Sequence, residues 1–187
     1  MTTETRLRAR YDTCQACQGK PVIALSRGEG QPRVLFVGEA PGRDEVKEGK
    51  PFVGKAGREL QRRIEKAGFH HYRLVNTIPC RPEGAYRRAL VRPCLPLFKE
   101  VVEAQEHPPE VVVAVGANAA WALHEQFAAD GERIVIQGFE VPLVQVLHPA
   151  SLYHPGGGQR REQMDRQWEH LERVVRATYK RPCPSPP

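Results

Sequence analysis

The chain has five cysteines, and four of them are spaced in a way that suits metal binding. Cys14 and Cys17 form a C-x-x-C pair, and Cys80 and Cys94 follow with 13 residues between them. An odd number of cysteines argues against a disulfide framework and for metal or redox use. Four thiolates can hold one tetrahedral zinc ion or one 4Fe–4S cluster, or they can remain thiols. Most zinc ribbons close with a second C-x-x-C, which this sequence lacks.

Three polar residues stand at the ends of apolar runs that we predict to be β-strands. Glu39 follows a run that ends at Gly38, Asn76 lies near the end of a second run, and His148 directly follows a third. The carboxyl ends of parallel strands share one edge of a sheet, where ligands bind in open α/β folds. There an amide can read the edge of a nucleobase, and a neutral imidazole can donate to an oxygen that gains negative charge. Asn76 could instead cap a turn, and His148 could be a structural hinge.

A glycine-rich loop over residues 38–57 leads from the first predicted strand into a helix. Its glycines leave backbone N–H groups free to face a ligand, and the helix adds a positive N-terminal end. The loop matches neither a Walker loop nor a dinucleotide fingerprint. Phe52 stands among these glycines with little local core to join, so we expect its ring to stack on a flat ligand rather than to fill the core.

Apolar runs alternate with amphipathic segments along the rest of the chain, which predicts a three-layer α/β/α fold with a central, roughly four-stranded parallel sheet. We expect a single domain over residues 1–180 that includes the N-terminal cysteine segment, and a disordered proline-rich tail over 181–187 that contains Cys183. The predicted strands are 34–37, 73–78, 110–115, 134–136 and 141–147, and the predicted helices are about 56–67, 94–106, 118–128 and 160–179.

The charge balance favours nucleic acid as a partner. The chain has 28 Lys and Arg against 22 Asp and Glu, a net charge of +6, and 21 of the basic residues are Arg, whose guanidinium group suits phosphate. A solvated, Arg-rich surface would give the same composition. No run approaches the roughly 20 apolar residues of a membrane span, and the first ten residues lack the apolar core of a secretory signal. We therefore expect a cytoplasmic protein, and a monomer.

Three segments together resemble the uracil-DNA glycosylases that carry an iron–sulfur cluster (family 4). GEAPG at 38–42 and GKPFVG at 49–54 resemble the first motif of that family, NTIPCRP at 76–82 resembles its base-recognition strand, and HPAS at 148–151 resembles its closing His-Pro motif. The resemblance implies a DNA repair enzyme that flips uracil out of single- or double-stranded DNA and hydrolyses its N-glycosidic bond, leaving an abasic site. It also implies a 4Fe–4S cluster, held by Cys14, Cys17, Cys80 and Cys94.

The resemblance gives three residues a direct role toward the base. Phe52 would stack on the flipped uracil. Asn76 would accept from N3–H and donate to O4, a pattern that cytosine reverses. His148 would stabilise the negative charge at O2 as the glycosidic bond breaks, so that electrostatic preorganisation is the main catalytic effect expected.

Further roles follow for the residues around these three. Gly38, Ala40 and Glu45 would line the pocket, and backbone N–H groups at Glu39 and Ala40 would assist His148. Related families place an Asp where this chain has Ala40 and use it to orient the attacking water. Glu39 and Glu45 are the nearby carboxylates, and of the two we expect Glu39 to take that role. Leu152 would push into the DNA stack as a wedge.

Two other functions fit parts of this pattern. One is a glycosylase with a shifted base preference, such as hypoxanthine or mispaired thymine, because Gly42 replaces the bulky aromatic that excludes thymine in another family. The other is a non-catalytic DNA-binding or redox-sensing iron–sulfur module, although such a module has no need of His148. A related family traps the abasic sugar covalently through a His in an inserted loop, and the corresponding segment here, 81–88, contains no His.

Overall fold

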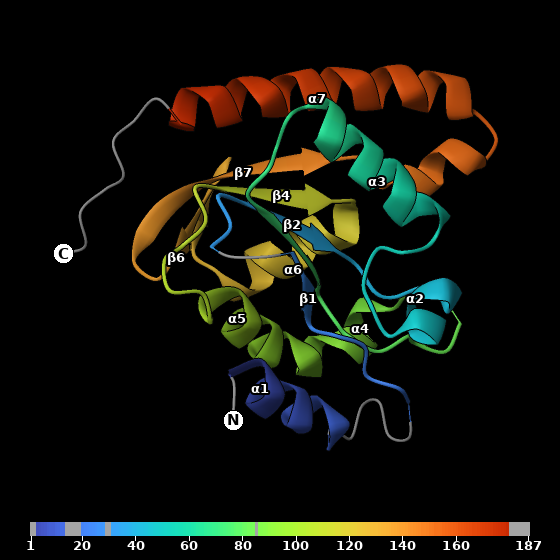
Figure 1. Ribbon diagram of the computed structural model, residues 1–187, viewed down its shortest axis with the longest axis vertical. Helices are drawn as coiled ribbons and strands as arrows, with labels where there is room; N and C mark the ends of the chain where they lie inside the picture. The colour runs from blue at the N-terminus through green and yellow to red at the C-terminus, as the bar shows by residue number, and fades with distance from the viewer. Residues whose placement is uncertain (1–2, 14–19, 29–30, 85, 180–187) are drawn as a thin grey trace.

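The structure is a computed structural model, and it describes residues 3–13, 20–28, 31–84 and 86–179 (Figure 1). Cys14, Cys17 and the tail with Cys183 lie outside the described residues, so the expectations about them stay predictions. Among the described helices, none combines the length and the apolar character that a membrane crossing requires.

A seven-stranded sheet forms the middle layer, in the order β1-β3-β2-β4-β7-β6-β5. The four central strands are parallel, as predicted, and the three outer strands pair antiparallel. The β2–β3 register places Gly38 opposite Asn76. The strands are β1 (Ser26–Arg27), β2 (Val34–Gly38), β3 (Tyr72–Asn76), β4 (Val111–Val115), β5 (Ala129–Asp130), β6 (Arg133–Ile136) and β7 (Phe139–Val146).

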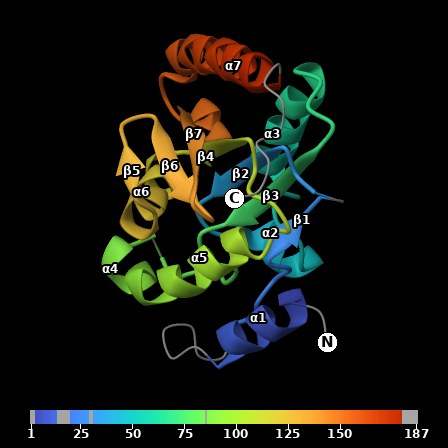
Figure 2. The ribbon, with the colours of Figure 1, turned by 90° about the vertical axis from the view of Figure 1, so that its left-hand side faces the viewer.

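Helices cover both faces of the sheet, which confirms the three-layer prediction (Figures 1 and 2). One face is covered by α3 (Lys55–Lys66) and α7 (Gly157–Tyr179). The other is covered by α5 (Leu95–Glu103) and α6 (Ala117–Gln126), with α1 (Thr3–Asp12) packed outside α5. Shorter elements lie in the connections: α2 (Arg43–Glu48), α4 (Arg88–Val91) and the 3-10 turns η2 (Arg92–Cys94) and η3 (Pro149–Tyr153).

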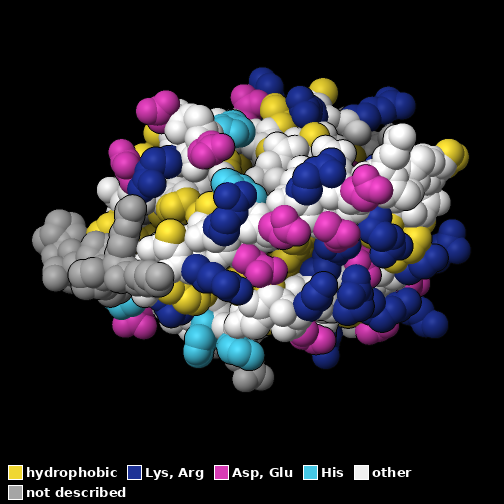
Figure 3. All heavy atoms as spheres, turned by 90° about the horizontal axis from the view of Figure 1, so that it is seen from above, with side chains coloured by type: hydrophobic (Ala, Val, Ile, Leu, Met, Phe, Trp, Pro, Cys, Tyr) yellow, Lys and Arg dark blue, Asp and Glu magenta, His cyan; other side chains and the backbone are white. Residues whose placement is uncertain are grey.

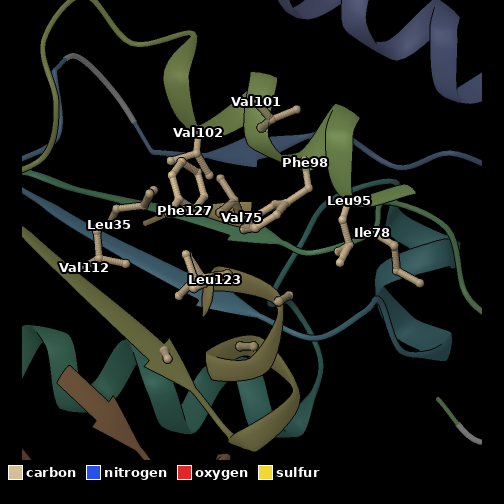
Figure 4. Close-up of a cluster of buried hydrophobic side chains, with 14 of the residues drawn as sticks. Leu35, Val75, Ile78, Leu95, Phe98, Val101, Val102, Val112, Leu123 and Phe127 are labelled. Carbon is tan, nitrogen blue, oxygen red and sulfur yellow. The ribbon is translucent and has the colours of Figure 1, made fainter. Parts of the chain in front are cut away.

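Alternation along β2 divides the core between the two faces. Leu35 packs with Phe98 of α5 and Leu123 of α6 (Figure 4). Phe36 points to the opposite face, where its ring stacks on Trp168 of α7 with centroids 6.1 Å apart. Successive side chains of a strand point to opposite faces, so a strand buried on both faces is apolar throughout.

The N-terminal helix α1 and the short helix α2 were not predicted. In α1 only Leu7 and Tyr11 reach the core, four residues apart on an otherwise charged helix, and two apolar residues are too few to show helical periodicity. In α2 the six residues lie between Gly42 and Gly49, which directly follows the last residue of the helix and has a φ of 70°. Six residues are too few to show helical periodicity, whereas α1 depends on its contacts with the rest of the fold.

Trp168 fixes α7 to the sheet, because its ring stacks on both Phe36 and Phe69. We predict that Trp168→Ala lowers the free energy of unfolding by about 3–5 kcal/mol, because it removes a large buried ring and leaves a cavity. Urea denaturation followed by circular dichroism measures this. Val135→Ala, at a position that is 37% exposed, is the control. Equal, small losses in the two variants would contradict the anchoring role of Trp168.

Candidate active site at the carboxyl ends of the strands

A cavity of about 300 Å³ lies at the carboxyl ends of the central strands. Five of the predicted site residues line it: Ala40, Glu45, Phe52, Asn76 and His148. The rest of the lining comes from the loop 38–57 and the turn after β7: Gly42, Arg43, Asp44, Gly54, Lys55, Ala56, Gly57 and Ala150. Of the residues that the structure describes, the predicted site residues Gly38, Glu39 and Leu152 are not in this lining.

Gly38 lets two functional side chains meet above the end of β2. A Cβ atom at this position would lie 2.4 Å from Cζ of Phe52 and 2.6 Å from Oδ1 of Asn76. Both side chains therefore lie against the bare Cα of Gly38, and any larger residue there would push them apart. Gly38 contributes to the site by the space that it leaves.

Phe52 has an unusual backbone conformation that the surrounding residues stabilise. Its φ is 57°, in the left-handed region that few side chains adopt. Its carbonyl oxygen accepts hydrogen bonds from Arg27 Nη1 at 3.1 Å and from Gln61 Nε2 at 2.5 Å. A Cβ atom at Gly57 would lie 2.3 Å from the carbonyl carbon of Phe52, so only glycine fits there. Phe52 is 7% exposed and belongs to the core shared with α7, so the expectation that it would not fill the core is wrong. It also lines the cavity, and its stacking on a flat ligand stays a prediction.

The carboxamide of Asn76 faces the cavity with its polar atoms available. Among the described residues it makes no side-chain hydrogen bond, so Asn76 does not cap a turn. Its position is set by the last pair of the β2–β3 ladder. An unpaired amide at the wall of a cavity is suited to bind a ligand that offers a donor and an acceptor side by side.

Glu45 ties the two halves of the glycine-rich loop together. Its carboxylate accepts from the backbone N–H of Gly42 at 3.0 Å and from that of Gly54 at 2.7 Å, and the residue is 9% exposed. Both oxygens are thus engaged by the protein. The observed contacts of Glu45 are with the loop, and they shape the wall of the cavity.

His148 presents a hydrogen-bond donor to the cavity. Its Nδ1 accepts from the backbone N–H of Ala150 at 3.2 Å, so the proton of the neutral imidazole is on Nε2. Burial lowers the pKa of His148 from its ordinary value of 6.5, against the opposing effect of the charges on Glu39 and Glu45. The imidazole is therefore neutral at neutral pH and can donate through Nε2.

Glu39 is fixed by residues that the sequence analysis did not single out. Asn118, near the start of α6, donates from Nδ2 to Oε2 of Glu39 at 2.8 Å. The hydroxyl of Thr77 donates to the backbone carbonyl of Glu39 at 2.5 Å and lies 3.1 Å from the hydroxyl of Tyr86, whose pKa burial raises to about 12. The position of Asn118, just after the end of β4, was the signal that could have identified it.

Leu152 and Tyr153 differ in exposure at the rim of the site. Leu152 is half-buried in η3 and packs against the core shared with α7. Tyr153 is 46% exposed, and the ammonium group of Lys55 lies 3.8 Å from the centre of its ring. The predicted wedge residue is thus the less exposed of the two.

The two described cysteines lie where the N-terminal segment meets the sheet. Cys80 and Cys94 are each 1% exposed. Val22 forms a β-bridge with Cys80, and α1 ends at Asp12 after packing on α5, which begins directly after Cys94. The chain on each side of residues 14–17 is thus attached next to one of these cysteines. Among the described residues there is no group of three or more metal-binding side chains, and Cys14 and Cys17 lie outside that part of the chain.

Basic side chains gather toward the end of the molecule where α7 begins and the strands end (Figure 3). Lys55 and Arg58, at the start of α3, are exposed. Arg63, by contrast, is buried and pairs with Glu59 at 2.8 Å and with Asp165 of α7 at 2.7 Å. Of the two adjacent arginines Arg62 and Arg63, Arg63 thus links α3 to α7 and is too buried to contact DNA.

The lowered pKa of His148 predicts how the free energy of unfolding depends on pH. Because the folded pKa lies below the unfolded value, the folded state binds fewer protons between the two, and the free energy of unfolding falls as the pH drops through this range. We predict that wild type loses stability relative to His148→Gln between about pH 7.5 and pH 5. Urea titrations at several pH values measure the difference, with His124→Gln as the control for loss of an exposed histidine. A difference that stays constant with pH would contradict the prediction.

Comparison with known proteins identifies the family. The family model described as the uracil DNA glycosylase superfamily matches residues 25–172. Three relatives named type-4 uracil-DNA glycosylase are similar to this chain. The one from Pyrobaculum aerophilum is 31% identical over 75% of this chain and 78% of its own length, and the one from Archaeoglobus fulgidus is 31% identical over 68% and 71%. The one from Thermotoga maritima is 29% identical over 68% of this chain and 66% of its own length.

The matched region contains the whole cavity lining, from Ala40 to Ala150, together with Cys80 and Cys94. The chain therefore belongs to the uracil DNA glycosylase superfamily and, within it, to the type-4 uracil-DNA glycosylases.

Proposed function

We propose that this chain is a monofunctional DNA repair glycosylase that flips uracil out of single- or double-stranded DNA and hydrolyses its N-glycosidic bond, leaving an abasic site. One observation carries the proposal: Phe52, Asn76 and His148 line a single cavity at the ends of β2, β3 and β7, in a chain of the uracil DNA glycosylase superfamily. The cytoplasmic location, the monomeric state and the single domain over residues 1–180 stay predictions.

Base recognition rests on Phe52 and Asn76. The ring of Phe52 lines the cavity and offers a face on which uracil stacks. Asn76 accepts from N3–H of uracil and donates to O4. Cytosine presents the opposite pattern at these two positions, so a bound cytosine leaves buried polar groups unpaired, which costs more than a missing apolar contact.

Bond cleavage depends on charge stabilisation by His148. As the glycosidic bond breaks, the sugar becomes cation-like and the base leaves as an anion with charge on O2. Nε2–H of His148 donates to this oxygen, and the hydrogen bond at Nδ1 holds the ring in the tautomer that allows it. A donor that is already oriented needs no reorganisation during the reaction.

Water activation is assigned to Glu39. Its carboxylate is half-buried, and its charge is close enough to His148 to oppose the lowering of that residue's pKa by burial. A carboxylate at this place orients an attacking water and also favours the cation-like sugar. Ala40, which lines the cavity beside it, has no side chain for this task.

DNA binding is assigned to the basic end of the molecule (Figure 3), and Lys55 at the start of α3 lines the cavity while Arg58 is exposed three residues later. Leu152 is proposed as the wedge that fills the gap left by the flipped base. Because Leu152 is half-buried, the η3 turn must open, or the neighbouring Tyr153 must share the contact.

The residues present fit a 4Fe–4S cluster held by Cys14, Cys17, Cys80 and Cys94. The two described cysteines are buried, and the chain flanking the other two is attached beside them. When bound, such a cluster crosslinks its four thiolates, and hydrolysis needs no electron from it. We propose a structural role in joining the N-terminal segment to the segment between Cys80 and Cys94.

The proposed activity predicts uracil release from a labelled single-stranded oligonucleotide with one central uracil, scored by strand breakage after alkali. We expect wild type to cleave, and Asn76→Ala and His148→Ala each to reduce the single-turnover rate by about 100-fold to 1,000-fold, because each removes a donor aimed at the base. Breakage at hypoxanthine or at mispaired thymine, but not at uracil, would show a shifted base preference. DNA binding without any breakage by a folded, metal-loaded preparation would show a binding module.

The proposed cluster predicts that Cys94→Ala loses iron and sulfide and lowers the thermal midpoint by at least about 10 °C, with activity falling only as a consequence of unfolding. Elemental analysis and calorimetry measure the two effects, and Cys183→Ala is the matched control. Bound zinc in place of iron and sulfide would contradict the cluster. Normal thermal stability with lost catalysis would contradict its structural role.

A further inference from the structure

We propose that Asn118 is a positioning residue that holds the carboxylate of Glu39 in its working orientation, with Arg88 fixing the direction of the Asn118 amide. This inference rests on the proposed glycosylase function and adds to it a pair of residues outside the cavity. Asn118 Nδ2 donates to Glu39 Oε2 at 2.8 Å, and Arg88 Nε donates to Asn118 Oδ1 at 3.3 Å.

Arg88 decides which end of the Asn118 amide faces Glu39. A guanidinium group can only donate, so it selects the amide oxygen and leaves the NH₂ group directed at the carboxylate. In the opposite orientation the amide oxygen would face Glu39, and two acceptors would repel each other. The hydrogen bond to Glu39 is charge-assisted, which makes it stronger than a bond between neutral groups.

The hydrogen bond from Asn118 engages only one oxygen of Glu39. Within the part of the chain that the structure describes, Oε1 of Glu39 has no hydrogen-bond partner. The backbone of Glu39 is held separately by the hydroxyl of Thr77. A carboxylate fixed through one oxygen, with the other available, is suited to accept a hydrogen bond from a water molecule.

The turn between β4 and α6 links this contact to His148. Gly116, with a φ of 96°, lies at this turn, and a Cβ atom there would be 3.1 Å from Cβ of His148. Asn118 follows two residues later. The same turn therefore sets the distance between the imidazole and the carboxylate, the two groups on which charge stabilisation and water activation depend.

Among the described residues, His148 after β7 and Tyr86 before α4 interact electrostatically with Glu39, and Glu45 of α2 also acts on His148. Arg88, at the start of α4, reaches Glu39 only through the Asn118 amide. Exchange of Asn118 for Asp keeps the shape of the side chain but places a second carboxylate against Glu39. Two carboxylates in hydrogen-bond contact cannot both ionise easily, so the pKa of the pair rises.

The test measures the single-turnover rate of uracil release at saturating enzyme as a function of pH, together with the Kd for DNA that carries an abasic-site analogue. We expect Asn118→Ala to lower the rate by about tenfold or more, with a Kd within about twofold of wild type. We expect Asn118→Asp to move the acidic limb of the rate profile to higher pH by about one unit. A merely structural role of Asn118 would leave the position of that limb unchanged.

Two matched controls separate positioning from charge. Arg88→Ala is expected to lower the rate by about threefold, whereas Arg92→Ala, which removes the same charge from a residue that pairs with Glu125, leaves it unchanged. Gln126→Glu adds a negative charge to the same helix and leaves the pH profile unchanged. If Asn118→Ala does not fold, the pH profile of the isosteric Asn118→Asp variant tests the positioning role of Asn118.

An active wild type whose Asn118→Asp variant keeps the wild-type rate and pH profile would overturn the inference and leave the proposed function intact. Equal losses for Arg88→Ala and Arg92→Ala would overturn the part assigned to Arg88. A folded wild type that releases no uracil would overturn the proposed function, and the inference with it.

Discussion

The pairing of β2 with β3 is the constraint on which the candidate site depends. The parallel register places Gly38 opposite Asn76, and the bare Cα of Gly38 gives the Asn76 carboxamide and the Phe52 ring room to meet. A slip of one residue would turn Asn76 to the opposite face of the sheet, because side chains alternate along a strand. Such a slip is unfavourable, because it would also move the packed apolar side chains of the strand to the opposite face of the sheet.

Around this pair, the protein fixes each polar group through atoms that the ligand does not need. Phe52 is held through its carbonyl oxygen, His148 through Nδ1 and Glu39 through one carboxylate oxygen. Phe52 and His148 line the cavity, and Oε1 of Glu39 has no hydrogen-bond partner among the described residues. This arrangement is what electrostatic catalysis requires, because the donors are oriented before charge develops.

Glu45 shows how a residue in a motif can act on the protein rather than on the ligand. Its two oxygens bind the N–H groups of Gly42 and Gly54 and so close the glycine-rich loop. On the face of the sheet opposite α7, Cys94 lies in the core, and α1 and the bridge between Val22 and Cys80 attach the N-terminal region. In both places irregular chain is held by a small number of specific contacts.

The sequence by itself determined the parallel four-stranded centre, and it predicted a site at the strand ends with Phe52, Asn76 and His148, which line one cavity in the structure. These follow from local patterns, because apolar runs and the turns that end them need no partner to be recognised. Only the tertiary structure decided that Glu39 meets Asn118, that Glu45 is occupied by backbone groups, and that Phe52 has a positive φ above Gly57. Some of these features are contacts between residues of separate elements, and one is a backbone conformation. Local sequence patterns predict neither kind, because both depend on how the helices and loops pack on the sheet. The helix α1 could likewise not be predicted from the sequence. It has only two buried apolar residues, Leu7 and Tyr11, and it is stabilised by packing against α5.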